Sequence, residues 1–243
     1  MKNILYSLLI TSLLLSSCDE EENLKQAGDI EMNFNLKAGT EDLVFEDETY
    51  TNSAGNQFSV SSFWMYISNI TLIGAEGTAD YILENDYHLI EGSKSISDLV
   101  IGLDSVPAGS YNAIRFSIGV DAPTNTDISA IVGELDPARA WNWNTGYKFV
   151  SLEGNFFPEG QEARGLIMHI GLDQNYKTLT VDFSNNLNIN GGMSNIDFSV
   201  DILKMFEGVH TIDFSVTNTI KAQPVESGQV ADNYAAGMIQ LMN

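Results

Sequence analysis

The chain has 243 residues, of which 44% are hydrophobic, enough to build the core of one large domain. Its 11 basic and 33 acidic residues give a formal net charge of −22. This charge repels phosphate backbones and anionic lipid headgroups, so nucleic acid is excluded as an expected partner. The single cysteine excludes an internal disulfide.

The first 17 residues are predicted to be a lipoprotein signal peptide. Lys2 precedes an apolar run from Ile4 to Leu15, which is too short to span a bilayer as a mature helix. The following "LSSC" resembles a bacterial lipobox, in which Cys18 becomes the first mature residue and carries the lipid. The alternative is an ordinary signal peptide that happens to contain a cysteine.

Residues 18–28 are predicted to be an acidic tether. The run Asp19–Glu22 resembles a signal for display on the outer face of the outer membrane, although acidic runs are also common in solvated linkers. We therefore expect an outer membrane lipoprotein of a Gram-negative bacterium, facing the periplasm or the cell surface. Its membrane contact would be the lipid on Cys18.

Residues 29–243 are predicted to form one antiparallel all-β domain, a β-sandwich. Apolar and polar residues alternate in segment after segment, and Gly, Asn, Asp and Ser separate the segments. No long helical segment lies between them, which argues against a parallel α/β sheet. The expected strands lie in residues 30–39, 57–74, 111–120, 177–184, 195–202 and 210–217.

Only short helical elements are expected. Asp136 and Pro137 match the cap and first position of a short helix. Residues 201–208 are expected to form a single turn that ends at Gly208. A C-terminal helical turn is predicted within residues 231–242, with Asp232 as its cap.

The chain lacks a nucleophile elbow, an HExxH zinc motif and a phosphate-binding loop, so we expect no catalysis. Two of its three histidines, His88 and His169, lie inside apolar strand-like runs, where most histidines are core or edge residues. If Leu166, Met168 and Ile170 face the core, His169 faces the other way. His210 is expected to open a strand after a turn.

Trp141 and Trp143 stand one residue apart in the polar segment "ARAWNWNTGYKF". Both could be packing residues, Trp143 at one end of the sandwich and Trp141 on the short helix. An unmodified indole is a poor metal ligand because its N–H can only donate a hydrogen bond.

Seven segments occur in the same order in the MbnP-like copper-binding proteins, and the chain resembles that family over about residues 29–243. The segments are "YTNSAGNQFSVSSFWMYISNITLIG", "YHLIEG", "VPAGSYNAIRFSIGVD", "GELDPARAWNWNTGYKFVSLEG", "MHIG", "VDILKMFEG" and "ADNYAAGMIQLM". The resemblance implies a copper site in which histidines and a kynurenine, made from tryptophan by a di-haem partner enzyme of the MauG type, are the ligands. It implies His88 and His169 as the histidines and Trp141 or Trp143 as the modified residue.

The leading hypothesis is thus a copper-binding envelope lipoprotein for copper acquisition or handling. A shared site requires the imidazole nitrogens of His88 and His169 to lie within roughly 5 Å of each other. The main alternative is a surface interaction module, whose aromatic residues stack on sugars or pack against a partner protein. A hydrolase built on clustered acids ranks last, because no two carboxylates stand at a defined spacing.

Overall fold

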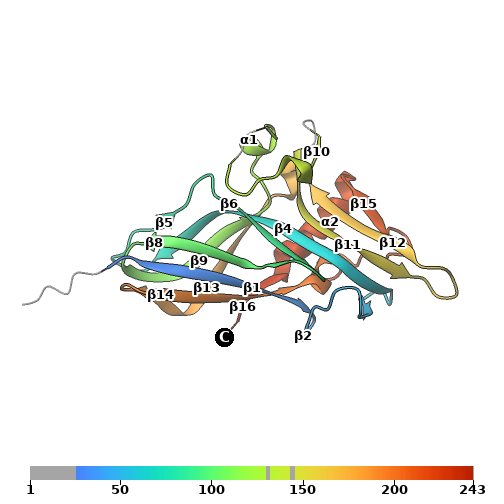
Figure 1. Ribbon diagram of the computed structural model, residues 1–243, viewed down its shortest axis with the longest axis horizontal. Helices are drawn as coiled ribbons and strands as arrows, with labels where there is room; N and C mark the ends of the chain where they lie inside the picture. Colours follow the sequence, from blue (N-terminus) through green and yellow to red (C-terminus); the bar gives the residue numbers. More distant parts are fainter. Residues whose placement is uncertain (1–25, 130–131, 143–145, 243) are drawn as a thin grey trace, which may run out of the picture.

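The computed structural model describes residues 26–129, 132–142 and 146–242 of the chain (Figure 1). The predicted signal peptide, the lipobox residue Cys18 and one tryptophan of the Trp141–Trp143 pair, Trp143, lie outside these ranges. Within them, no helix is long and apolar enough to cross a membrane.

Two β-sheets form the domain, as the alternating sequence predicts. The smaller sheet has five strands: β1 (Gly28–Ala38), β2 (Glu41–Asp42), β8 (Val100–Val106), β14 (Met193–Asp201) and β16 (Ile239–Leu241). The larger sheet has 11 strands in the main order β13-β9-β4-β11-β12-β15. These are β3 (Tyr50–Thr51), β4 (Gln57–Gly74), β5 (Tyr81–Ile82), β6 (Tyr87–Ser93), β7 (Ser97–Asp98), β9 (Gly109–Ile118), β10 (Ala140–Asn142), β11 (Gly146–Phe157), β12 (Arg164–Gly171), β13 (Lys177–Ile189) and β15 (Thr219–Lys221).

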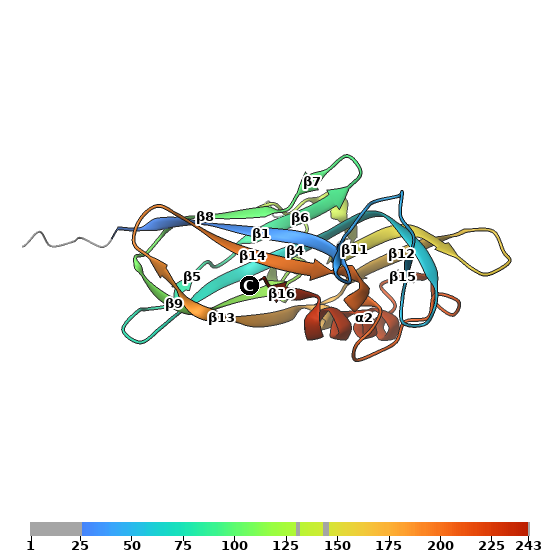
Figure 2. The ribbon, with the colours of Figure 1, turned by 90° about the horizontal axis from the view of Figure 1, so that it is seen from below.

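The core lies between the two sheets, so the prediction of a β-sandwich is confirmed. Buried and half-buried residues alternate strictly along β1, as expected for a strand with one face on a core. Phe34 of β1 stacks on Phe198 of β14 at 5.2 Å between ring centroids. Phe198 in turn meets Phe116 of β9 at 5.7 Å, which joins the small sheet to the large one. Figure 2 shows β1 and β14 crossing in front of the larger sheet.

Most strand pairs are antiparallel, as predicted, but two are not. β1 pairs with β14, and β12 pairs with β15, in parallel. Each pair joins segments that are far apart in sequence, so no hairpin turn sets the direction of pairing. Side-chain alternation has the same period in parallel and antiparallel strands and cannot reveal it.

The helical elements are α1 (Ala122–Asn125), η1 (Pro137–Arg139), η2 (Asp173–Asn175), η3 (Ile202–Met205) and α2 (Pro224–Gly237). The Asp136 side chain caps η1 by accepting a hydrogen bond from the Ala138 N–H, as predicted. A helix is present near the C-terminus, as predicted, but its start and its cap differ from the prediction. Asp232 lies inside α2, which starts at Pro224, and residues 239–241 form β16.

The segment 210–217 is not a strand, contrary to prediction. Asp213 accepts a hydrogen bond from the Ser215 N–H and turns the chain back on itself. A short aspartate side chain that binds nearby backbone favours a turn over an extended strand.

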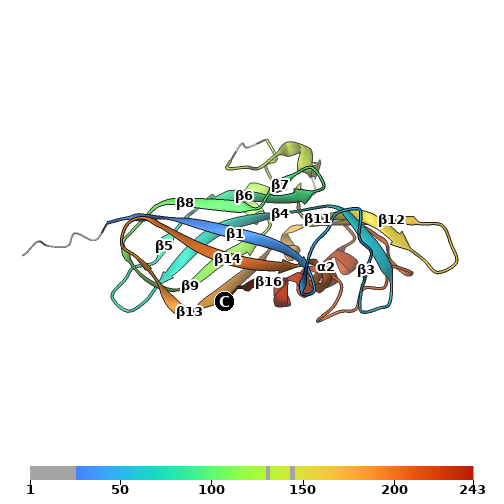
Figure 3. The same cartoon turned by 60° about the horizontal axis from the view of Figure 1, so that its bottom comes forward.

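The long strand β4 is buried on both faces. Met65 and Ile67 point to the inner face, towards the small sheet, and are fully buried. Trp64 and Tyr66 point to the outer face, yet only 8% and 0% of their surfaces are exposed. The cover is a segment that follows β9, residues 121–142, which is described except for residues 130 and 131 and is here called the covering segment. It projects beyond the sheets in Figure 3.

The strands β11 and β4 approach so closely that Gly154 admits no side chain. A Cβ atom at this position would lie 1.9 Å from the Ser59 carbonyl oxygen. Gly154→Ala should therefore lower the free energy of unfolding by about 1–3 kcal/mol, as expected for overpacking. Gly165→Ala, on the paired strand β12 with no atom within 4 Å, is the matched control and should unfold close to wild type. Equal urea midpoints for the two variants would contradict this account.

Candidate functional site

Four side chains form a row across the outer face of the larger sheet. Glu91 on β6, Trp64 on β4, Ser151 on β11 and His169 on β12 stand in register. Directly paired residues in a sheet share a face. His169 therefore faces outward, as the alternation around it predicts, while Leu166, Met168 and Ile170 are fully buried on the other side.

His169 is held as a neutral imidazole. Only 9% of its surface is exposed, and this burial lowers its pKa from the ordinary value of 6.5. The charges of Lys148 and Lys221 lower the pKa further, against the opposing effect of Glu153. The Nε2 atom lies 2.7 Å from the Oε1 atom of Glu153. Because a carboxylate only accepts hydrogen bonds, Nε2–H donates, and the lone pair resides on Nδ1.

Trp141 of β10 packs on the same face, next to His169. A Cβ atom on Gly171 would lie 2.7 Å from Cζ3 of the Trp141 ring, so the indole lies directly over this glycine. Gly171 is two residues beyond His169 on β12, and residues i and i+2 of a strand share a face. The Nε1 atom of Trp141 is buried and has no hydrogen-bond acceptor among the described residues. An indole N–H without an acceptor is destabilising by about 1–3 kcal/mol.

Arg139 ties the covering segment to the sheet. Its guanidinium lies 4.9 Å from the centroid of the Trp64 ring, a cation–π contact. The same group donates a hydrogen bond of 2.8 Å to Glu91. Next to it, the hydroxyl of Tyr66 accepts a hydrogen bond from the Asp136 N–H. These contacts fix the backbone that leads directly into Trp141.

His88 does not join this site. It pairs with Ile67 and lies two residues from Ile90 on β6, so it shares the inner face with both. His88 and His169 thus lie on opposite faces and three strand spacings apart, about 14 Å. The expectation that their nitrogens approach within 5 Å is therefore wrong. His88 instead lies 2.8 Å from the carboxylate of Asp86.

The third histidine, His210, is also remote from the row. Its Nε2 atom lies 3.4 Å from Asp232 of α2. In the part of the chain that the structure describes, no group of three or more His, Cys, Asp or Glu side chains is arranged to hold a metal. The residues as encoded therefore bring one imidazole and one indole together, and not a complete set of ligands.

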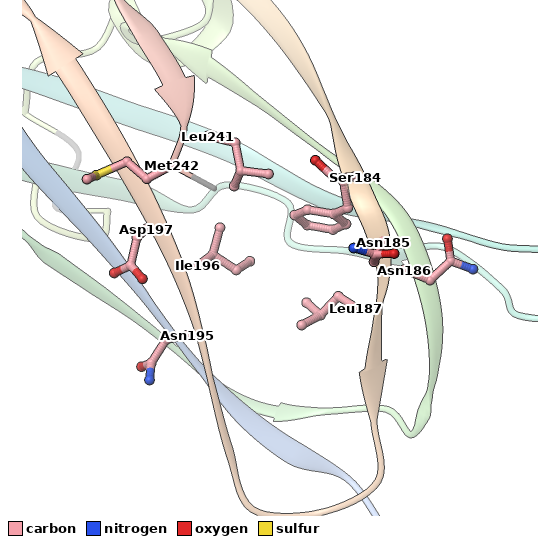
Figure 4. Close-up of a pocket in the computed structure, with 10 residues that line it drawn as sticks. Ser184, Asn185, Asn186, Leu187, Asn195, Ile196, Asp197, Leu241 and Met242 are labelled. Atoms are coloured by element: carbon pink, nitrogen blue, oxygen red, sulfur yellow. The ribbon is translucent and has the colours of Figure 1, made fainter.

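A separate cleft of about 360 Å³ opens between β13 and β14 (Figure 4). Its lining combines apolar side chains with asparagines and one carboxylate: Phe183, Leu187, Ile196, Leu241, Met242, Asn185, Asn186, Asn195 and Asp197. β13 lies at one edge of the larger sheet, whereas β12 lies next to the strand at the other edge, β15, so this cleft contributes nothing to the site around His169.

Comparison with known proteins bears on the family of the chain. The sequence profile of the MbnP family matches residues 27–225. The chain belongs to the MbnP family. The solved structure of MbnP from Methylosinus trichosporium superposes with a TM-score of 0.52 and 16% sequence identity, over 76% of this chain and 80% of that one. At this identity the match demonstrates the fold. No curated protein matches the sequence.

Five residues around the candidate site of this MbnP-family protein were not identified from the sequence: Glu153, Lys148, Lys221, Arg139 and Gly171. Glu153 and Lys148 follow from strand pairing that no local pattern reveals. Arg139 could have been identified from the sequence, because it lies between the capped turn and Trp141, next to the tryptophan pair.

The bond between His169 and Glu153 allows a direct test. Glu153 raises the pKa of His169 through its hydrogen bond and its charge, so Glu153→Gln should lower that pKa further. Side-chain NMR titration of the three histidines measures this shift. Glu159→Gln, which removes the same charge at the β11–β12 turn, should leave the His169 pKa unchanged. A His169 pKa that does not move in Glu153→Gln would mean that this carboxylate is not bound to the imidazole.

Proposed function

We propose that this MbnP-family protein is a copper-binding protein of the cell envelope, for copper acquisition or handling, and not an enzyme. The site is the outer face of the larger sheet, with His169 and an oxidised tryptophan as ligands. The observation that supports it most is that one face carries both a neutral imidazole and a buried indole nitrogen with no hydrogen-bond partner among the described residues.

The residues fit this chemistry in a specific way. Neutral imidazole is a preferred copper ligand, and the Glu153 carboxylate would orient it as an outer-shell partner. An intact indole offers no lone pair. Opening its ring to kynurenine converts the ring nitrogen into an aniline-type donor, so the second ligand would exist only after modification.

Trp141 is the tryptophan whose surroundings favour modification to a copper ligand. Its Nε1 atom, the atom that becomes the aniline nitrogen, has no hydrogen-bond partner among the described residues, and the indole ring lies over Gly171 of β12. Trp143, the other candidate, lies outside the described residues. The oxidant would be a di-haem partner enzyme of the MauG type, as the family resemblance implies. His88 would then be no ligand of this site.

Mass spectrometry of protein from the native host tests the modification. Conversion of tryptophan to kynurenine adds one oxygen and removes one carbon, so a gain of about 4 Da is expected. It should map to the peptide with Trp141 and Trp143 and be absent from Trp64, which lies under Arg139. In the modified protein, His169→Gln should weaken copper binding, since a ligand is lost, whereas His88→Gln should leave it unchanged. Unmodified tryptophans in native protein, together with equal effects of the two histidine variants, would refute the proposal.

The envelope location depends on the lipid anchor proposed at Cys18. Cys18→Ala should release the protein from the membrane fraction and leave the signal peptide uncleaved at the lipobox, because one residue carries the whole anchor. Cell fractionation measures this, and external protease separates the periplasmic from the surface-exposed orientation. Membrane retention of Cys18→Ala would show that another segment holds the protein.

A surface interaction module remains the second candidate, on a different surface. A cleft between α2 and the preceding loop is lined by Ile212, Val216 and Ile220. Val216 is 81% exposed, and Val225 at the start of α2 is 68% exposed. Exposed apolar side chains around a cleft favour contact with a partner protein.

A further inference from the structure

The strand β13, at one edge of the larger sheet, is covered only in part. Its residues Leu179 and Val181 pair with fully buried residues of β9 and face the core with them. They are nevertheless only half-buried, as are Phe183 and Leu187 further along the strand. β16, the edge strand of the smaller sheet beside the cleft, has only three residues, Ile239–Leu241. The two sheets therefore leave an opening along this edge.

The opening is the cleft between β13 and β14, and its interior is apolar. In Figure 4 the side chains of Leu187, Ile196 and Leu241 point into the space between the two strands. Asn195 and Asp197, the neighbours of Ile196 in β14, point to the other side of that strand. The alternation of a β-strand thus places apolar groups inside the cleft and polar groups on its rim.

β14 presents unpaired backbone groups to this cleft. β16 pairs with Phe198–Val200 of β14, and next to this pair the Asp197 carbonyl accepts a hydrogen bond from the Met242 N–H. Residues i and i+2 of a strand direct their backbone groups to the same side, so the N–H and C=O of Asn195 face the cleft. Among the described residues, no strand pairs with Asn195 on this side. Unpaired N–H and C=O groups along a strand are a template for a further strand.

β13 is irregular where it borders the cleft. Asp182 pairs with Ala113 of β9 and Leu187 with Tyr111, so residues 183–186 lie opposite a single residue of β9. Bulges of this kind bend a strand and are common beside binding sites. Because the backbone of β13 is distorted here, the regular edge of β14 is the better template for an incoming strand.

The charge around the cleft selects the kind of segment that fits. The lining includes the carboxylate of Asp197 and no lysine or arginine, and the whole chain has a net charge of −22. A strand beside β14 would direct alternate side chains inward, to Leu187 and Ile196, and the others outward, to the face that carries Asp197. Apolar side chains suit the inward positions, and basic side chains suit the outward ones.

We propose that this cleft binds an extended, basic peptide segment of a partner protein, which adds a strand to β14 in line with β16. Hydrogen bonds to the backbone of β14 would supply affinity, and apolar side chains in the cleft would supply specificity. The binding involves neither copper nor the outer face of the larger sheet. Its test is therefore independent of the copper proposal.

The test uses full-length protein and a short blocked peptide in which valine and threonine alternate between two terminal lysines. Calorimetry should show saturable binding, and hydrogen exchange at the Asn195 amide should slow because its N–H becomes bonded. No saturable binding would overturn the proposal. The same peptide with glutamates in place of the lysines should bind more weakly, and equal binding would overturn the preference for a basic segment.

Backbone methylation separates strand pairing from attraction between charges. Two versions of the lysine peptide are methylated, one on every valine nitrogen and the other on every threonine nitrogen. Successive N–H groups of a strand point to opposite sides, so one version can still donate to β14 and the other cannot. One version should bind like the parent peptide and the other about tenfold or more weakly. Equal effects of the two methylations would exclude an added strand.

Two lysine substitutions on β13 test the location. Leu187→Lys places a positive charge in the cleft and should weaken binding of the lysine peptide by about tenfold or more. Leu179→Lys makes the same change at an equally half-buried leucine of the same strand, outside the lining, and should bind as wild type. Equal binding by the two variants would overturn the proposed location.

A variant of β14 keeps the location testable if Leu187→Lys does not fold, which thermal unfolding measures. Asn195→Pro removes the N–H that faces the cleft, a change that strand edges tolerate. It should also abolish the binding of the lysine peptide, and unchanged binding by a folded Asn195→Pro protein would overturn the proposal.

Discussion

The structure depends on one constraint, the need to bury the outer face of β4. A central strand that carries Trp64 and Tyr66 on the side away from the sandwich core exposes two large aromatic rings unless another segment covers them. The covering segment does so through the Arg139 guanidinium over Trp64 and the backbone N–H of Asp136 on the Tyr66 hydroxyl. The same contacts determine the position of Trp141, because it follows Arg139 closely in the chain.

The electrostatics of the site follow from this cover. Burial under neighbouring groups holds His169 neutral, and two lysines on adjacent strands reinforce the effect. Glu153 opposes it and selects the tautomer by accepting the Nε2 proton. A neutral, oriented imidazole with its lone pair on Nδ1 is thus a property of the folded sheet. It does not require a bound metal to create it.

The features that local sequence patterns encode, such as the face on which His169 lies, could be predicted. The neighbours that strand pairing brings to His169 could not. Alternation around His169 identified its face correctly, because Leu166, Met168 and Ile170 are all apolar. Around His88 the neighbours Tyr87, Leu89 and Ile90 are apolar on both faces, so alternation was uninformative. The parallel pair β12–β15 brings Lys221 beside His169 across 51 intervening residues, with no local signal. The alignment of β11 with β12 adds Lys148 in the same way.

Two histidines of the chain lie close to a carboxylate, at nearly equal distances, but only one of them lies at the candidate site. His169 lies 2.7 Å from Glu153, and His88 lies 2.8 Å from Asp86. The contact of His169 with Glu153 has hydrogen-bond geometry, whereas His88 Nε2 and Asp86 Oδ2 have no hydrogen-bond partner among the described residues. The two histidines also lie on different faces of the sheet. In the part of the chain that the structure describes, the covering segment lies on the outer face, and with it an indole whose nitrogen has no hydrogen-bond partner. The location of the candidate site is therefore a consequence of how β4 is covered, and the histidine on the covered face is the one in a position to act.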